Sequence, residues 1–562
     1  MTRHGDEARL PALPTAKGNS ASDRRWLVLA VMSVGTLLAF LDDTVVNTAL
    51  PRISLSLHAS TSALQWVVDG YVLVLAGSLL LCGSIGDRYG RKRAMTLGLM
   101  AFGVAAIGAS QSTSMSQLIT MRAFQGLGAA LILPATLSII TNVFPRQERA
   151  RAIAVWTAIG GLGVGLGPVL GGYLVDAASW HAVFLLFVPL VAVALAGMVI
   201  VPESRDDRRI GLDLPGAILG TVGLSALVYG IIHAGEAGWG NGTSLASFGA
   251  AALLLGLFAV VEARATAPML PLRFFRQRDF TGAVLLIGMV LFAMFVTFFF
   301  LTQLFQLVQH RTALGAGLLI VPTSIAVTIS AGISGKLIHT AGPRVLAVGM
   351  TLGMMIGLAV LSRTTESTST TQIVLALVVF GLGAGLALPA LTDTVMAAVP
   401  ERDAGVGSAV NDVSRQLGGA LGVAVIGSFV ISAYRTNLHH AIRGAIPSAA
   451  TRAASSSIGV AEQTARHLPP KVAATLTHAA NHSFVSAITR GFEVSMVVVA
   501  LAFVVAATMV PRRMRTSQLE VEPSPRPEAG PKYERPEPAP RPLTTPASWA
   551  RPATVHLERE RT

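Results

Sequence analysis

Charged residues are scarce in this chain, and their scarcity argues against an ordinary soluble domain. Asp, Glu, Lys and Arg make up 13% of its 562 residues, whereas a typical soluble domain carries roughly 25%. Hydrophobic residues make up 52% and come in runs such as 26–40, 71–82 and 492–510. A helix crosses a bilayer with about 20 apolar residues, because its backbone polar groups are then satisfied within the segment. The sequence therefore predicts an all-α protein that spans a membrane many times.

Cysteine and the usual signatures of enzyme chemistry are also nearly absent. The single cysteine, Cys82, lies inside an apolar run, so it can form neither an intrachain disulfide nor a thiolate metal site. The sequence contains no P-loop, HExxH motif or cluster of metal ligands. Segment 1–25 lacks the apolar core and cleavage site of a secretory signal. We therefore expect no enzyme, no metal and no cofactor, and we expect the first apolar run to remain as a span.

The formal net charge of +13 could indicate a nucleic-acid partner, since basic surfaces gather phosphates. The positions of the arginines argue otherwise, because they cluster in short loops such as 88–93 and 146–151. Such clusters mark the cytoplasmic side of a membrane, where they also meet anionic lipid. We therefore expect a lipid bilayer and no nucleic acid as partner, with both termini cytoplasmic.

The apolar runs predict fourteen spans. Their approximate bounds are 26–50, 64–85, 94–112, 117–140, 152–174, 182–202, 213–234, 246–263, 280–309, 314–338, 343–362, 371–397, 415–433 and 492–510. The expected parts begin with a cytoplasmic tail at 1–25, a six-helix bundle at 26–205 and two linker helices at 206–279. A second six-helix bundle follows at 280–510, with a long external loop at about 434–491. The last part, 511–562, is expected to be a disordered Pro-rich cytoplasmic tail.

The chain carries an internal repeat. Residues 126–135 read GLGAALILPA, and residues 381–390 read GLGAGLALPA, which is identical at eight of ten positions. Gly163 and Gly167 recur at the same offset as Gly418 and Gly422. Spans one to six therefore recur as spans nine to fourteen, and spans seven and eight have no counterpart. Repeated halves are the usual plan of secondary transporters, although a duplicated scaffold helix bundle would also show them.

The loop after span two reads GSIGDRYGRKR over residues 83–93, and it resembles the signature loop of the major facilitator superfamily. Glycines let helix ends approach closely, and a carboxylate at a helix end can hold an arginine or cap a neighbouring helix. The resemblance implies a latch between the two halves, formed by Gly83, Asp87, Arg88, Gly90 and Arg91. In the second copy His339 stands where Asp87 would fall, which predicts a weaker latch there.

Span five carries glycines at helical spacing beside a proline. This pattern predicts a tight helix interface with a kink, whatever the function. It is similar to the antiporter motif of proton-coupled exporters, in which the matching residues are Gly163, Gly167, Pro168, Gly171 and Gly172.

The end of span one, LDDTVVNTALP at residues 41–51, is close to the signature of the fourteen-span drug/proton antiporter family. The resemblance implies a fold of two six-helix bundles plus two linker helices in a bacterial plasma membrane. It also implies a monomeric transporter that is driven by a proton gradient and needs no cofactor. His181 and Phe187 depart from the Arg and Asn usual in that family, which leaves the substrate open.

Charged side chains inside spans are costly, so each is a functional hypothesis. Asp42 lies in the outer half of span one, and Asp69 and Arg122 lie about 8 Å inside the outer ends of their spans by the helical rise. We expect this group to exchange a proton for a cationic substrate, since burial disfavours a charged carboxylate and a nearby cation favours it. The alternative for each of these three residues is a structural ion pair or a solvated helix end. Asp43 is interpreted as a sequence neighbour of Asp42 without a role of its own. Two further acids are interpreted as solvated helix ends: Glu262 and Asp393.

The leading hypothesis is proton-coupled efflux of small amphipathic drugs or metabolites by alternating access, as in multidrug efflux and antibiotic resistance. A second hypothesis is a dedicated exporter of one endogenous metabolite or antibiotic, which serves self-resistance. A third, from another class, is a membrane scaffold without transport. Neutral substitutions at Asp42, Asp87 and Arg122 would be silent in a scaffold.

Overall fold

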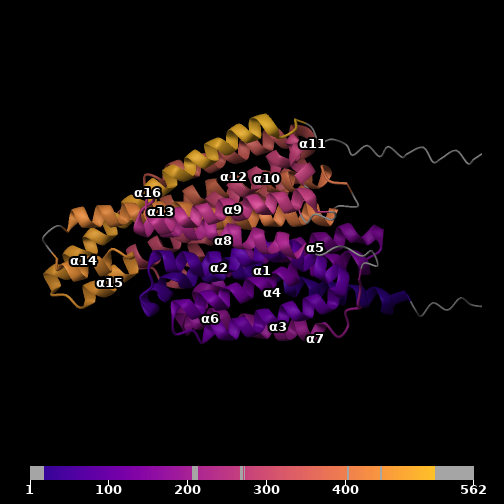
Figure 1. Ribbon diagram of the computed structural model, residues 1–562, viewed down its shortest axis with the longest axis horizontal. Coiled ribbons are helices and arrows are strands. Elements are labelled where there is room, and N and C mark those ends of the chain that lie inside the picture. The colour runs from indigo at the N-terminus through magenta and orange to yellow at the C-terminus, as the bar shows by residue number, and fades with distance from the viewer. Residues whose placement is uncertain are drawn as a thin grey trace, which may run out of the picture. The chain divides into compact units, whose positions relative to one another are not determined.

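Helices make up the architecture of the first half of the chain. The computed structural model describes residues 18–205, 213–265, 270, 272–400, 404–442 and 446–512, and within them it contains no strand. The first half consists of α1 (Gly18–Leu57), α2 (Thr61–Tyr89), α3 (Arg91–Ser110), α4 (Met115–Val143), α5 (Arg146–Ala177), α6 (His181–Leu185) and α7 (Phe187–Gly197), drawn in indigo to purple in Figure 1.

The rest of the chain continues the pattern with two linker helices and a second half. The linkers are α8 (Leu214–Ala237) and α9 (Gly242–Arg264). The second half consists of η1 (Leu272–Arg276), α10 (Arg278–Gln303), the π turn η2 (Leu304–Val308), α11 (Ala313–Leu361), α12 (Thr370–Ala397), α13 (Ala404–Ala441), α14 (Ser448–Ala454), α15 (Ile458–Arg466) and α16 (Pro470–Met509).

Several helices begin at a residue whose side chain accepts a hydrogen bond from the first turn. Ser60, Ser114 and Asn241 do so at the starts of α2, α4 and α9. Thr312 and Ser369 do so for α11 and α12. Such caps satisfy backbone N–H groups that have no partner within the helix, so each helix begins directly after a short connection.

Thirteen helices of the described chain are long and apolar enough to cross a membrane, and His181–Gly197 is a shorter apolar stretch where the sixth span is expected. The all-α prediction is confirmed, and the count of fourteen stays a prediction. The predicted spans 314–338 and 343–362 lie within one helix, α11, which is interrupted at Gly342 with φ 79°. A glycine at positive φ changes the helix direction without a steric penalty.

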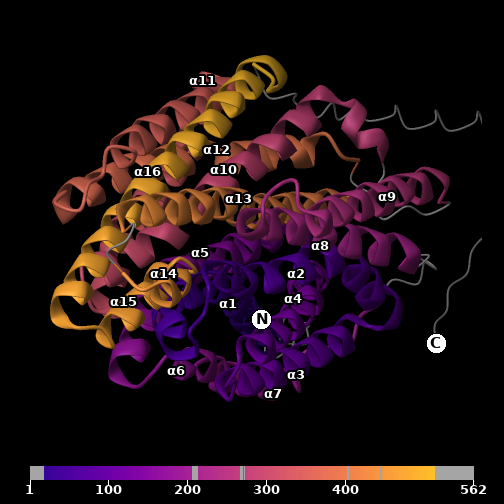
Figure 2. The same cartoon turned by 60° about the vertical axis from the view of Figure 1, so that its left-hand side comes forward.

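Most of the stretch predicted as a long external loop, at about 434–491, is helical. Helix α13 continues to Ala441 and α16 begins at Pro470, which leaves 442–469 between them. Within that stretch α14 and α15 form a pair of short helices, here called the α14–α15 hairpin (448–466), which Figure 2 shows beside one end of α16. Hydropathy marks only the part of a helix that suits lipid, whereas alanine-rich flanks also favour helix and extend it.

The sequence repeat corresponds to repeated helix packing. A Cβ atom at Gly126 would overlap the Tyr71 carbonyl oxygen of α2, and one at Gly381 would overlap the Thr323 carbonyl oxygen of α11. Gly163 packs α5 against α1, and its equivalent in the second half, Gly418, packs α13 against α10 in the same way. The duplicated glycines therefore hold equivalent helix pairs together in both halves.

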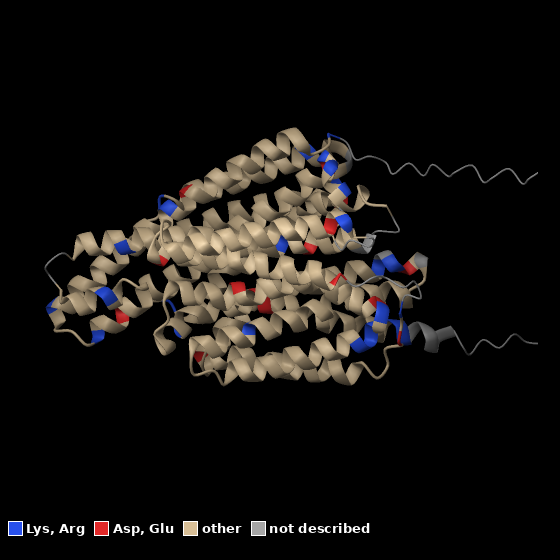
Figure 3. Cartoon of the chain, in the orientation of Figure 1, with Lys and Arg blue, Asp and Glu red and all other residues tan. Residues whose placement is uncertain are grey.

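The two ends of the helices differ in their charged residues. Figure 3 shows lysines and arginines gathered at the end where α3 and α5 begin, here called the arginine-rich end, and the α14–α15 hairpin at the other, the hairpin end. The hydrogen bonds between the two halves of the described chain lie between the level of Asp43 and the hairpin end. Among the described residues, the hydrogen bonds between the two halves thus lie on the side of the hairpin end.

Candidate functional site

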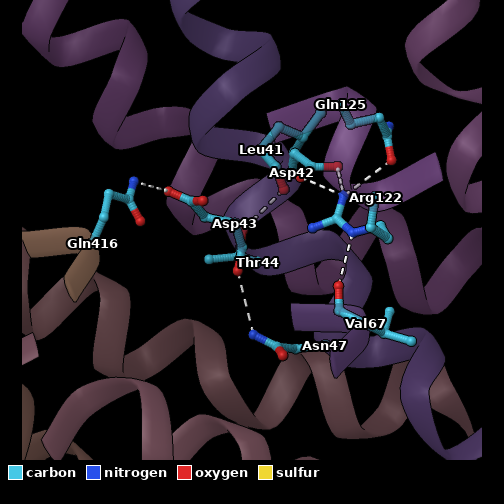
Figure 4. Close-up of polar contacts among 9 residues, drawn as sticks. All are labelled: Leu41, Asp42, Asp43, Thr44, Asn47, Val67, Arg122, Gln125 and Gln416. Atoms are coloured by element: carbon cyan, nitrogen blue, oxygen red, sulfur yellow. Dashed lines mark hydrogen bonds and ion pairs between the residues drawn. The ribbon is translucent and has the colours of Figure 1, made fainter. Parts of the chain in front are cut away.

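A buried arginine lies at the centre of the first half. Arg122 of α4 is 2% exposed, and its Nη1 lies 2.8 Å and 2.6 Å from the two carboxylate oxygens of Asp42 on α1. Its Nε donates to the Val67 carbonyl oxygen of α2 at 3.0 Å. Figure 4 shows how the guanidinium joins the three helices. Buried charges are tolerated when they are paired and hydrogen-bonded in this way.

Two further side chains surround the same guanidinium. Gln125, one turn along α4, accepts a hydrogen bond from Nη1 of Arg122 at 3.1 Å. The ring of Tyr71 on α2 lies 4.4 Å from the guanidinium carbon, a distance at which a cation is attracted to an aromatic face. Gly126 brings α4 close enough to α2 for these contacts, because a side chain there would overlap the Tyr71 backbone.

Asp69 has different surroundings from Asp42. Its side chain is 0% exposed on α2, and neither of its carboxylate oxygens makes a hydrogen bond among the described residues. Of the three charged residues expected to act as one group, Asp42 and Arg122 form an ion pair, whereas Asp69 makes none with Arg122. The site therefore contains one neutralised carboxylate and one carboxylate that has no cation.

Asp43 links the first half to the second. Gln416 of α13 donates to a carboxylate oxygen of Asp43 at 3.5 Å, and Asn47 donates to the backbone oxygen of Asp43 at 3.3 Å (Figure 4). The contact joins residues 373 positions apart in the sequence. Asp43 therefore faces the boundary between the halves, while Asp42, its neighbour in α1, faces the core of the first half.

Sequence reasoning missed several members of this site. Gln125 lies three residues after Arg122 and could have been included, because residues three apart share a helix face. Gln416 and the Val67 carbonyl carried no local signal, since their roles depend on which helices become neighbours. Tyr71 lies two residues after Asp69, and only the rotation of α2 aims its ring at Arg122.

The five residues predicted to form a latch lie at the arginine-rich end, from the last two turns of α2 to the start of α3. Asp87 and Arg91 form an ion pair of 2.8 Å with each other, one turn apart. Gly90 has φ 116°, a conformation that side chains rarely adopt, and it turns the chain between the helices. Gly83 lies near Pro134 of α4, and Arg88 lies over the ring of Tyr89. Among the described residues, these side chains make their contacts within the first half.

Glu203 extends this turn and carried no motif signal. Its carboxylate accepts hydrogen bonds from the backbone N–H groups of Lys92 and Ser204, both at 3.1 Å. The backbone of Arg91 donates to the Ser204 carbonyl oxygen at 2.9 Å. A carboxylate at the first turn of a helix satisfies free N–H groups and suits the helix dipole. Glu203 thus fixes the start of α3 beside the latch residues.

The antiporter-motif residues form the tight interfaces predicted for span five. Gly163, Gly167 and Gly171 face α1, where added side chains would meet Leu37, Thr44 and Val45. Gly172 points away from α1, toward the backbone of Ala313 and Leu314 in the second half. Pro168 lies inside α5, and its carbonyl oxygen leaves no room for a side chain at Gly317.

The two acids interpreted as solvated helix ends differ from each other. Asp393 is exposed, in agreement with that interpretation. The interpretation of Glu262 is wrong, because its side chain is 3% exposed and accepts a hydrogen bond from the backbone of Leu270 at 3.2 Å. The backbone of Leu270 therefore lies beside the Glu262 carboxylate. Among the described residues, no group of three or more His, Cys, Asp or Glu side chains could hold a metal ion.

Comparison with known proteins gives extended similarities. The family model of the Major Facilitator Superfamily matches residues 32–423. The multidrug efflux pump LfrA of Mycolicibacterium smegmatis is 32% identical over 489 residues, which cover 87% of this chain and 96% of that protein. The tetracenomycin C resistance and export protein of Streptomyces glaucescens is 32% identical over 495 residues, which cover 86% of this chain and 91% of that protein.

Solved structures share the fold at low identity. A bacterial homologue of the human lysosomal transporter Spinster, in an inward-facing and unoccupied conformation, has a TM-score of 0.58 at 17% identity, covering 88% of this chain and 99% of that one. A peptide transporter, POT, in complex with sulfate has a TM-score of 0.55 at 14% identity, covering 87% and 96%. At these identities the likeness concerns the fold alone.

Proposed function

Because the chain belongs to the Major Facilitator Superfamily, we propose that it exports small amphipathic drugs or metabolites in exchange for protons, by alternating access. It is a multi-pass bacterial membrane transporter that acts on small molecules, and not an enzyme. Its relatives are named for drug efflux and antibiotic resistance. Transporters of this superfamily generally need no cofactor, and the driving force proposed here is the proton gradient.

The observation that carries the proton coupling is the contrast between two buried acids. Asp42 is neutralised by Arg122, whereas Asp69 is equally buried and has no cation beside it. Burying an unpaired carboxylate costs several kcal/mol, so a proton or a cationic substrate would stabilise Asp69. We assign Asp69 as the acid at which proton and substrate compete, and Asp42 with Arg122 as the pair that senses that exchange across α1, α2 and α4.

The charge distribution supports an orientation for the cycle. Loops rich in arginine stay in the cytoplasm, so the arginine-rich end is assigned to the inside and the hairpin end to the outside. Among the described residues, the hydrogen bonds between the halves lie toward the outside, which corresponds to a state that is closed outward. The residues from Gly83 to Arg91 would then join the second half when the inside closes. The protein is proposed to work as a monomer made of the 26–205 and 280–510 bundles.

A dedicated exporter of one compound remains the second candidate. The observation in its favour is the similarity to a protein named for tetracenomycin C alone, which is as extensive as the similarity to the multidrug pump. A multidrug exporter should respond to many compounds in a substrate panel, whereas a dedicated exporter should respond to one. A transport assay with such a panel therefore separates the two candidates.

The test uses inverted membrane vesicles with an imposed pH gradient and a panel of amphipathic cations, with proton release on addition of compound as readout. Parent vesicles are expected to release protons with several compounds. Asp69→Asn is expected to lose substrate-induced release, because no carboxylate then exchanges a proton at that position.

The matched control is Asp393→Asn, the same change at an exposed acid. It should behave as the parent. If Asp69→Asn vesicles release protons as the parent does, the role of Asp69 is refuted. A response to a single compound in the panel would favour the dedicated exporter.

A further inference from the structure

We propose that Asp176 is a positioning residue that holds the outer face closed by capping a helix of the opposite half. Asp176 lies in the last turn of α5, and its two carboxylate oxygens accept hydrogen bonds from the backbone N–H groups of Ala313 at 3.1 Å and Leu314 at 2.8 Å. Those residues begin α11 in the second half. The inference rests on the proposed alternating access, and Asp176 belongs to none of the family motifs.

The free backbone N–H groups at the start of α11 are hydrogen-bonded by two residues, Thr312 and Asp176. Thr312 precedes the helix, and its hydroxyl oxygen accepts from Gly315 at 3.0 Å. This cap comes from the same segment and moves with α11. The N–H groups of the first two residues are bonded to Asp176, which belongs to α5. The free N–H groups and the dipole of a helix start attract a carboxylate, and charge-assisted hydrogen bonds are stronger than neutral ones.

The surrounding backbone shows that this contact closes a tight interface. An added side chain at Gly172 would lie 2.6 Å from the Cα atom of Leu314. One turn deeper, a side chain at Gly317 would overlap the Pro168 carbonyl oxygen. The two helices therefore meet without intervening side chains directly below Asp176, and they cannot separate at the outer face without breaking both hydrogen bonds.

The cost of opening follows from the position of the partners. When the outer face opens, the carboxylate and the two N–H groups part and are hydrated separately. The closed state therefore gains energy that the open state lacks, and only such differential interactions shift a conformational equilibrium. Asp176 thus sets how readily the exporter opens to release its substrate.

The test measures the two conformations directly in the full-length protein. In a Cys82→Ala background, nitroxide pairs are placed at the exposed positions Gln111 and Ser367 on the outer face, and at Asn142 and Thr340 on the inner face. Distance distributions are recorded by pulsed electron spin resonance in lipid nanodiscs. Asp176→Asn is expected to raise the open-to-closed ratio of the outer pair about tenfold, equivalent to about 1.4 kcal/mol, and Asp176→Glu is expected to keep the parent distribution.

The matched control is Asp213→Asn, which makes the same change at another helix start. Asp213 accepts from the Gly216 N–H at 2.8 Å within its own segment, so its substitution should leave both distributions unchanged. A second variant, Ala313→Pro, removes one of the two donors but keeps the Asp176 charge, and proline is well accepted at a first helical position. It should shift the outer pair in the same direction.

Unchanged outer distances in both Asp176→Asn and Ala313→Pro would overturn the proposal. An equal shift in Asp213→Asn would overturn it as well, because the effect would then be general destabilisation. The measurement uses no gradient and no substrate. A failure of proton coupling would therefore leave the distance result intact, and a failure of the Asp176 proposal would leave the vesicle result intact.

Discussion

At the scale of single residues, the pairing of Asp42 with Arg122 separates two acids that look equivalent in sequence. Both Asp42 and Asp69 are fully buried, yet only Asp42 meets the guanidinium. Nε of Arg122 also donates to Val67, Nη1 also donates to Gln125, and the ring of Tyr71 lies against the guanidinium. The arginine is thus bound on several sides and is a fixed charge around which an exchangeable proton at Asp69 can act.

Removing only one member of this pair should be more harmful than removing both. Arg122→Gln leaves Asp42 buried without a cation, and breaking a buried pair in this way costs about 3–5 kcal/mol. The double variant Asp42→Asn with Arg122→Gln removes both charges and should recover part of the loss. Thermal unfolding of the purified proteins in detergent measures this, as a Tm that is higher in the double variant than in Arg122→Gln. Additive losses in Tm would show that the two side chains are not coupled.

At the scale of helices, the repeat explains why glycines recur at fixed places. Gly418 packs α13 against α10 so closely that a side chain would overlap the Gly288 carbonyl oxygen, and Gly163 meets α1 at the equivalent place. Without water between them, membrane helices associate through close packing, which small residues allow. The glycines therefore determine which helices pair within each half.

A methyl group at one of these contacts should separate the helices. Gly418→Ala places a Cβ atom against backbone, which cannot rotate away, and overpacking of this kind costs about 1–3 kcal/mol. Gly161→Ala is the matched control in α5, because no atom lies within 4 Å of its added Cβ. Thermal unfolding should show a lowered Tm for Gly418→Ala and a Tm close to the parent for Gly161→Ala. Equal values would mean that the α10–α13 contact relaxes freely.

At the scale of the whole chain, the α14–α15 hairpin of the second half is bonded to the first. The backbone of Thr61 donates to the Ser456 carbonyl oxygen at 3.2 Å, and Ser457 donates to the Ala59 carbonyl oxygen at 3.1 Å. Gln463 also donates to the Leu55 carbonyl oxygen. These bonds reach across the halves at the hairpin end, where α1 ends and α2 begins.

A disulfide at this place should trap the conformation. Thr61→Cys with Ser456→Cys, in a Cys82→Ala background, introduces thiols on backbones that are already hydrogen-bonded, which brings them within disulfide range. Oxidation should abolish substrate transport in inverted membrane vesicles, and a reductant should restore it, because alternating access requires the two halves to separate at this place. The single Thr61→Cys variant should be insensitive to oxidant. Continued export by the oxidised, cross-linked protein would contradict a cycle in which this face opens.

The sequence by itself determined the all-α membrane class, the duplicated halves, the family motifs, and Asp42, Asp69 and Arg122 as buried charges. These features depend on hydropathy and on spacing within one helix, which are local properties. Only the tertiary structure decided that Arg122 pairs with an acid 80 positions away and not with Asp69, that helix replaces much of 434–491, and that Asp176 caps α11. Such choices depend on the rotation and neighbours of packed helices, and no local pattern records which faces will meet.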